Sequence, residues 1–330
     1  MFENDNLKQL AVDLYHDRKL SFNDVPGDVA MRNLIAEALG QKAGEKIEHY
    51  NWEANKLKVF QILSVAVDAV MPAILTNQFD TLAEVRNVAM GDKPRFEIED
   101  NSLMHVSMIA SGTQDLQRQE LFGSHFTVDT DWYGAKVYAE FERFMTGNVN
   151  WSTLVDRIAL SFANYTQTRI YEAFAKSYPT VRASRKDSGT YDEDKLIELA
   201  AHVSAAAGGK EVQVFGTKAA LRKVTRTTDK SGNMKDKFNQ VGYLDTVAGL
   251  DLIALPQAYK AGTEEFAISD NMLLILPKGE KIVSIVLEGE AIVNDTDFMT
   301  RNDMQREFVT MKKMGIRVAA LSIYGLYEMV

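Results

Sequence analysis

One stretch of the chain approaches the pattern of a phosphate-binding loop, Gly208-Gly209-Lys210. Such a loop needs closely spaced glycines, so that backbone N–H groups can approach the anion, followed by Lys and then Ser or Thr. Here Ser204 stands where the first glycine should be, and Glu211 stands where the hydroxyl should be. The pattern therefore indicates a helix that ends at glycine and leads into a strand, and we expect no cofactor.

A second stretch has the spacing of a calcium loop, with Asp129, Asp131 and Glu140 as possible ligands. In such a loop alternate residues supply oxygens and a bidentate Glu closes the site. Tyr133 supplies no carboxylate, and Lys136 stands where an apolar side chain would pack. We therefore predict a strand end with a turn, and no metal.

The other residues that could act as acids, bases or ligands are scattered. Asp295 and Asp297 could pair as acid and base only inside a cleft, and their polar neighbours favour a turn. No Gly-x-Ser-x-Gly motif occurs, and no paired histidine spacing is available for zinc. The five histidines are His16, His49, His105, His125 and His202. We predict no catalytic residue and no enzyme.

Two basic runs could contact the phosphates of a nucleic acid. They are interleaved with Asp187, Asp229 and Asp236 and lack stacking aromatic residues. The chain has 37 Lys and Arg against 46 Asp and Glu, a net charge of −9, which argues against a dedicated nucleic-acid binder. We interpret both runs as solvated or subunit-facing loops. The runs are Arg182, Arg185 and Lys186, and then Arg222, Lys223, Arg226, Lys230, Lys235 and Lys237.

The composition of the 330 residues, 46% hydrophobic and 25% charged, is typical of a soluble globular protein. There is no cysteine, which excludes disulfides and thiolate chemistry. The acidic N-terminus lacks the pattern of a secretory signal. The longest apolar stretch, Leu63 to Leu75, contains Asp68 and Pro72 and is shorter than the roughly 20 residues needed to cross a bilayer. We expect no membrane association.

Helices and then a long hairpin are predicted for the first half of the chain. Residues 1–80 are mostly helical in pattern, and a helix over 45–70 should end near Pro72. Residues 95–110 and 121–132 alternate loosely, and the second arm should close at Gly134. At ~3.3 Å per residue such a hairpin would extend about 40 Å. A two-stranded ribbon of this length is marginal in water, so we expect it to rest on another subunit.

A long helix and then an α/β region are predicted next. Apolar residues keep helical spacing from Leu154 to Phe174, in a rod nearly 40 Å long at ~1.5 Å per residue. A polar linker should follow at 180–190. The remaining predictions are helices at 192–207 and 218–224, a strand at 211–215, an exposed loop at 225–238, strands at 241–244 and 250–255, a strand pair at 272–276 and 282–287, and strands at 307–313 and 316–323 that meet near Gly315.

The order of these elements resembles the major capsid protein of tailed bacteriophages, the Hong Kong ninety-seven fold that encapsulins and the herpesvirus capsid floor share. The resemblance covers about residues 45–330. The segments that carry it are Gly91-Asp92 before the hairpin, Asn150 to Lys176, Val212 to Gly216 with the helix to Val224, Gly242 to Pro256, and Phe308 to Leu321.

The resemblance implies an α+β fold with an N-terminal arm, an extended E-loop hairpin, a peripheral (P) domain with a long spine helix, and an axial (A) domain. On this basis we expect a helical N-terminal arm at 1–80, the E-loop hairpin and its base at 81–135, the P-domain with the spine helix at 136–180, the A-domain at 181–265, and return strands of the P-domain at 266–330, whose end could belong to the A-domain.

The resemblance also implies a structural function: a virion protein that assembles through pentamers and hexamers into an icosahedral shell around double-stranded DNA, in the host cytoplasm. Portal and scaffold proteins would be partners, and DNA would be enclosed without specific binding. The E-loop would lie over a neighbouring subunit, with contacts through Asp115, Arg118, Glu120 and Phe122. No lysine occurs from Pro94 to Ala135, so the Lys–Asn crosslink of the founding member is not expected at the hairpin tip.

Two alternatives stay open at the level of the sequence. The same fold could form an encapsulin-like nanocompartment that encloses cargo enzymes. An α/β enzyme could also be built on residues 191–330, and a bound nucleotide or metal would then be its sign.

Overall fold

The computed structural model describes residues 4–15, 27–42, 45–97, 105–109, 118, 125–140, 151–226, 232–257, 259–260, 263–296, 305–319 and 323–329. They belong to two compact units. Unit 1 comprises Met1–Pro94, Val128–Thr166 and Ser284–Ile316, and unit 2 comprises Arg95–Thr127, Gln167–Val283 and Arg317–Val330. Each unit is described by itself.

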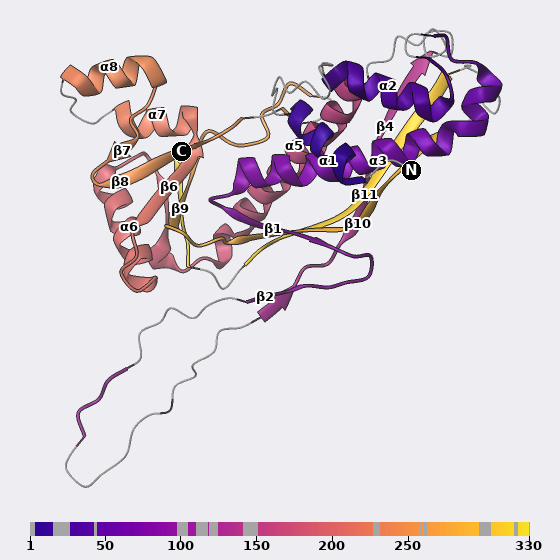
Figure 1. The fold of residues 1–330 in the computed structure, drawn as a ribbon. Coiled ribbons are helices and arrows are strands. Elements are labelled where there is room, and N and C mark those ends of the chain that lie inside the picture. Colours follow the sequence, from indigo (N-terminus) through magenta and orange to yellow (C-terminus); the bar gives the residue numbers. More distant parts are fainter. Residues whose placement is uncertain are drawn as a thin grey trace. The chain divides into compact units, whose positions relative to one another are not determined.

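Unit 1 contains the N-terminal helices and the first part of the spine helix. Figure 1 shows α1 and α2 beside α3, against which both pack. The helical pattern predicted before residue 80 and the long helix predicted after residue 150 are both confirmed. These helices are α1 (Asn4–Tyr15), α2 (Gly27–Leu39), α3 (His49–Phe79) and α5 (Trp151–Ser177).

The longest helix, α3, continues through Pro72, where the sequence predicted its end. A proline inside a helix removes one hydrogen bond and costs about 3 kcal/mol. Beyond it, Ile74, Leu75 and Phe79 are 0%, 0% and 2% exposed. Burial of each such side chain contributes about 1.5–3 kcal/mol, so packing outweighs the proline.

By length and composition alone, α3 could cross a membrane, and it is the one helix among the described residues that meets this test. Twelve of its side chains are buried in the protein, among them Trp52, Val59 and Ile74. In this structure α3 is therefore the core helix of unit 1.

The sheet of unit 1 has four strands in the order β1-β10-β11-β4. Strands β11 and β4 are antiparallel, in a register that runs from Gln305 opposite Glu140 to Met314 opposite Asp131. The strands are β1 (Ala83–Val88), β4 (Asp131–Glu140), β10 (Val283–Thr296) and β11 (Gln305–Val318).

Three predictions for this sheet were wrong. Strand β1 was not predicted, and Gly134 and Gly315 lie inside β4 and β11 instead of ending strands. A Cβ at Gly134 would lie 3.2 Å from the Met311 side chain, and one at Gly315 would overlap the Asp129 carbonyl oxygen. These glycines permit the close approach of neighbouring groups. Glycine in a strand can mark such an approach as well as a turn or a bulge.

Unit 2 has a six-stranded mixed sheet in the order β5-β12-β9-β6-β8-β7. Helices α6 and α7 pack on it around a core that includes Leu196, Val214, Leu221, Ile275 and Tyr327. The elements are β5 (Lys186–Gly189), α6 (Glu193–Ala206), β6 (Val212–Thr217), α7 (Lys218–Arg226), α8 (Gly232–Val241), β7 (Thr246–Val247), β8 (Leu250–Leu255), β9 (Met272–Pro277) and β12 (Gly325–Met329).

The predicted order of helix, strand and helix at the start of this unit is confirmed. The Asp192 side chain accepts a hydrogen bond from the backbone N–H of Asp194 and caps α6. Gly208 and Gly209, with φ of 72° and 85°, end the helix in the left-handed conformation that favours glycine.

Other predictions in unit 2 were wrong. Residues 232–241 form helix α8 instead of a loop followed by a strand at 241–244. Met234 and Phe238, four residues apart, pack against the core, and the surrounding charges hid this short apolar pattern. The predicted linker contains two 3-10 turns, η1 (Tyr178–Thr180) and η2 (Ala183–Arg185), and strand β5, which pairs in parallel with β12.

The strands predicted as pairs at 272–276 and 282–287 are not paired: β9 lies in the sheet of unit 2, and β10 lies in the sheet of unit 1. The predicted strands at 307–313 and 316–323 are replaced by the single strand β11 and by β12. The sequence pattern located apolar strands, but it did not specify their partners, since pairing depends on contacts distant in sequence.

Candidate functional site

The predicted hairpin has a structured base in unit 2. Strands β2 (Arg95–Glu97) and β3 (His125–Thr127) pair antiparallel, with Phe96 opposite Phe126. The two rings stack at 5.6 Å between centroids, and Phe96 is 2% exposed. The Arg317 guanidinium lies 5.1 Å from the Phe126 ring centroid and donates a hydrogen bond to the Thr127 carbonyl oxygen at 2.9 Å. These contacts fix the hairpin base to the end of β11.

One described segment of the hairpin, residues 105–109, presents apolar side chains to solvent. Val106 is 92% exposed, Met108 is 102% exposed and Ile109 is 47% exposed. Soluble monomers expose single apolar residues without consequence, but a contiguous apolar stretch marks an interaction surface. We call residues 105–109 the hairpin arm.

Of the four contact residues predicted for the hairpin, the structure describes one. Arg118 is exposed. Asp115, Glu120 and Phe122 lie outside the described residues. The geometry therefore adds Val106 and Met108 to the candidate contacts, and the sequence signal that could have found them is two apolar residues two positions apart in a polar segment.

The sheet of unit 1 has one face that holds its helices. On β11, Phe308 packs on Trp52 of α3, Lys312 binds Asp68 of α3, and Met314 accepts a hydrogen bond from Thr166 of α5. Because alternate residues of a strand point to opposite faces, the residues between these point away from the helices. Residues opposite each other on antiparallel strands share a face.

The face that points away from the helices is exposed mainly along β4, whereas Glu307 of β11 on the same face is 8% exposed. On β4, Trp132 is 47% exposed and Tyr138 is 65% exposed. Lys136 of β4 forms an ion pair with Glu307 of β11, with 2.6 Å between Nζ and Oε2. We call this surface the open face; it comprises Trp132, Lys136, Tyr138, Glu307, Val309, Met311 and Lys313.

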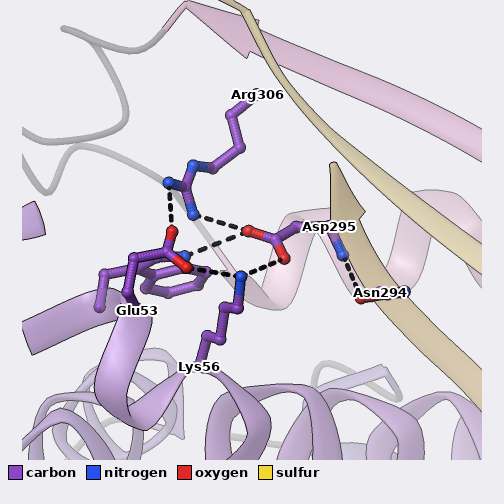
Figure 2. A network of polar contacts seen from close by, with 6 residues as sticks. Glu53, Lys56, Asn294, Asp295 and Arg306 are labelled. Atoms are coloured by element: carbon purple, nitrogen blue, oxygen red, sulfur yellow. Dashed lines mark hydrogen bonds and ion pairs between the residues drawn. The ribbon is translucent and has the colours of Figure 1, made fainter. Parts of the chain in front are cut away.

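A buried ionic network joins α3 to β10 and β11 (Figure 2). The Arg306 guanidinium binds Asp295 at 2.6 Å and Glu53 at 2.9 Å. Lys56 binds the same two carboxylates, Glu53 at 2.6 Å and Asp295 at 3.2 Å. Trp52 donates from its indole N–H to Asp295 at 3.3 Å, and Arg306 lies 5.4 Å from the Trp52 ring centroid.

The network shifts the pKa of its partly exposed members. Burial alone would raise the pKa of Glu53, but hydrogen bonds from Lys56 and Arg306 outweigh burial and lower it. The sequence placed Asp295 in a turn, which was wrong: Asp295 is on β10, and its side chain is fully shielded. A cation at a buried position of an alternating strand, Arg306, is the signal that could have predicted a carboxylate partner.

Two further ionic contacts lie along the same strands. Glu288 of β10 accepts from Lys313 at 2.7 Å, from the Thr130 hydroxyl and from the Gly91 backbone N–H at 2.8 Å. The hydrogen bond from Lys313, supported by those from Thr130 and Gly91, lowers the pKa of Glu288 to about 2.

The second contact centres on α3. Lys312 binds Asp68 at 2.6 Å, and Asp68 also accepts from the backbone N–H of Ala291 at 2.9 Å. Ion pairs thus join the helices and strands of unit 1 at several points. None of these pairs resembles a catalytic arrangement with a free nucleophile. Among the described residues, no group of three or more His, Asp or Glu could hold a metal ion.

Comparison with solved structures identifies the class of protein that this fold defines. The chain is similar to the mature capsid subunit of bacteriophage PhiM1 (11% identity, 76% of this chain, 86% of that chain, TM-score 0.52) and to the capsid of a native GTA particle (14% identity, 78% and 90%, TM-score 0.53). It is also similar to the structure of Mycobacterium phage Adephagia (12% identity, 78% and 90%, TM-score 0.51). The chain has the phage major capsid protein fold that the sequence order predicted, with the long spine helix and the hairpin.

A family model described as "SPbeta prophage-derived putative capsid protein YonB" matches residues 6–324. The chain belongs to this family. No curated protein sequence matched the chain.

Proposed function

We propose that this protein is the structural major capsid protein of a tailed phage, and that it assembles through pentamers and hexamers into an icosahedral shell around double-stranded DNA. Its membership of a prophage-derived capsid family and its capsid fold support this proposal. In the proposed particle the DNA is enclosed without specific contacts, which agrees with the net charge of −9.

The observation that carries the proposal is the apolar surface that one copy leaves exposed. Met108 and Val106 are almost wholly in water. Burial of one such side chain is worth about 1.5–3 kcal/mol, and a shell repeats each contact around closed rings. We propose that the hairpin arm lies over a neighbouring copy, and that Asp115, Arg118, Glu120 and Phe122 contribute to the same contact.

The proposed domain organisation follows the family arrangement: the arm at 1–80, the E-loop at 81–135, the P-domain at 136–180 with return strands at 266–330, and the A-domain at 181–265. Portal and scaffold proteins are proposed partners, the virion capsid is the proposed location, and assembly is proposed to occur in the host cytoplasm.

Cryo-electron microscopy of the purified chain, alone and with a scaffold protein, tests the proposal. We expect closed shells with fivefold and sixfold capsomers. Deletion of Ser111 to Glu120 should leave a soluble, helical subunit that forms no shells, whereas particles of normal size from the deletion variant would refute the role of the hairpin. A full-length chain that stays strictly monomeric at high concentration would refute the proposed function itself.

The contents of particles made during infection separate the two kinds of shell. A phage capsid should enclose DNA and carry a single portal vertex. Particles filled with a cargo enzyme, without DNA, would instead support the nanocompartment alternative.

A further inference from the structure

One end of the sheet in unit 2 carries an unusual concentration of positive charge. Residues 218–238 contain seven Lys and Arg against two Asp, a net charge of +5 (7 − 2), so the rest of the chain carries −14 (−9 − 5). Helix α7 places Lys218, Arg222 and Arg226 at intervals of four on one exposed side, and Lys235 is exposed on α8. We call these four residues the basic face.

The basic face has no internal counter-charge in the described part of the chain. None of its four residues lies within ion-pair distance of a described carboxylate. The aromatic ring of Phe238 lies 6.0 Å from the Arg222 guanidinium and orients it. Four other lysines of unit 2, by contrast, each bind a carboxylate at 2.8–3.3 Å: Lys195, Lys210, Lys260 and Lys278. A positive surface with no carboxylate partner in the described part of an acidic chain favours a negative partner outside the copy.

The other end of the same sheet carries a negative surface. On α6, Asp194, Ile197 and Glu198 are exposed, and their spacing of three and four residues places them on one side of the helix. Asp194 is in the first turn, where the helix dipole favours acidic residues. Glu198 lies a full turn further on, beyond that effect, and its side chain is 73% exposed. We call these three residues the acidic face.

The two faces lie on different helices, which extend toward opposite ends of the sheet. Both helices contact the central strands β9 and β6, but α6 also packs on β12 and β5, whereas α7 also packs on β8. In the strand order β5-β12-β9-β6-β8-β7, α6 therefore extends toward the β5 end and α7 toward the β7 end. The acidic face includes one exposed apolar residue, Ile197 at 39%, and Val241 at the end of α8 is 38% exposed. Two unlike, complementary surfaces on one subunit are the requirement for a head-to-tail ring.

We infer that the basic face of one copy binds the acidic face of α6 in the next copy around the capsomer. This inference rests on the proposed function, since it specifies a contact within the proposed pentamers and hexamers. Electrostatic complementarity of this kind fixes the register of neighbours and speeds their encounter, and like charges placed opposite each other cost several kcal/mol. A nucleic acid could also bind a basic surface, but the basic face offers no exposed aromatic for base stacking.

Charge reversal and rescue test the inference. Arg222→Glu with Arg226→Glu should reduce the assembled fraction, measured by sedimentation, by about tenfold or more, because like charges then meet. Adding Asp194→Arg and Glu198→Arg to the same chain should restore assembly close to the wild-type level. The rescue also shows that the first pair of substitutions did not prevent folding.

The matched control is Lys46→Glu with Lys58→Glu, which changes the net charge by the same amount at exposed positions of unit 1. We expect the control to assemble normally. Loss of assembly in the control, or failure of the fourfold variant to recover, would overturn the inference. Normal assembly of the reversed variant with reduced DNA retention would also overturn it and assign the basic face to nucleic acid. In each of these cases, the formation of shells by the wild-type chain would still support the proposed function.

Discussion

Nη1 of Arg306 lies 2.6 Å from Oδ2 of Asp295, and neither side chain is exposed to solvent. A buried ion pair of this kind gains little over a well-packed apolar pair, because both charges lose their hydration. Removal of one partner is different, since it leaves the other charge buried with less compensation. The pair therefore makes the fold of unit 1 sensitive to single substitutions at β10 and β11.

We predict that Arg306→Met destabilises the unassembled subunit by about 3–5 kcal/mol, measured by urea unfolding. Arg306→Met combined with Asp295→Leu should recover part of this loss, because no unpaired buried charge then remains. Arg86→Met is the matched control: its pair with Glu84 is 39% and 41% exposed, and it should cost less than about 1 kcal/mol. Equal losses at Arg86 and Arg306 would contradict the role of burial.

The stability of unit 1 should fall in acid because of Glu288. Its pKa is lowered from 4.5 to about 2 in the folded chain, so the stabilisation is complete above the unfolded pKa and is lost as the pH falls from about 4.5 to 2. Urea unfolding at pH 7 and pH 3 should show the loss, and Glu288→Gln should lessen the difference between the two values. An unchanged pH dependence in Glu288→Gln would show that other groups are responsible.

The double variant Val106→Asp with Met108→Asp should reduce assembly without lowering the stability of the subunit. Both residues are exposed in one copy, and surface substitutions of this kind usually alter stability by less than about 0.5 kcal/mol. Trp52→Ala serves as the contrast, because Trp52 is fully buried and truncation of a core Trp costs about 3–5 kcal/mol. Thermal unfolding and sedimentation together separate the two effects. A normal yield of shells from the double Asp variant would show that the hairpin arm does not contribute to the contact between copies.

Assembled particles boiled in detergent should release bands of monomer size only. The segment from Pro94 to Ala135 contains no lysine, so the hairpin tip has no amine for an isopeptide bond. Ladders of linked chains on a denaturing gel would show that a lysine elsewhere reacts.

Local patterns in the sequence predicted the elements whose apolar spacing is long and regular. Helices α3, α5 and α6 fall into this group, as do strands β6 and β8. The order of these elements was sufficient to identify the capsid fold. The end of α3 was misplaced because Ile74, Leu75 and Phe79 are buried by tertiary packing, which outweighs the local effect of Pro72.

The contacts were less predictable than the elements. The partners of Arg306 are 11 and 253 residues away in sequence, and no local pattern can join them. Gly134 and Gly315 have the same appearance in sequence as turn glycines, because only the neighbouring strand shows that a side chain would not fit. The hairpin was predicted from its alternation, yet three of its four predicted contact residues lie outside the described part of the chain.

Arg306, Lys312 and Lys313 of β11 are paired with carboxylates of α3 and β10 in the same chain. These pairs need no neighbouring copy, so we expect a subunit to keep its fold when the proposed shell is taken apart. Agents that act on contacts between copies, such as salt, should then release intact subunits able to reassemble, whereas strong acid would damage the subunits themselves.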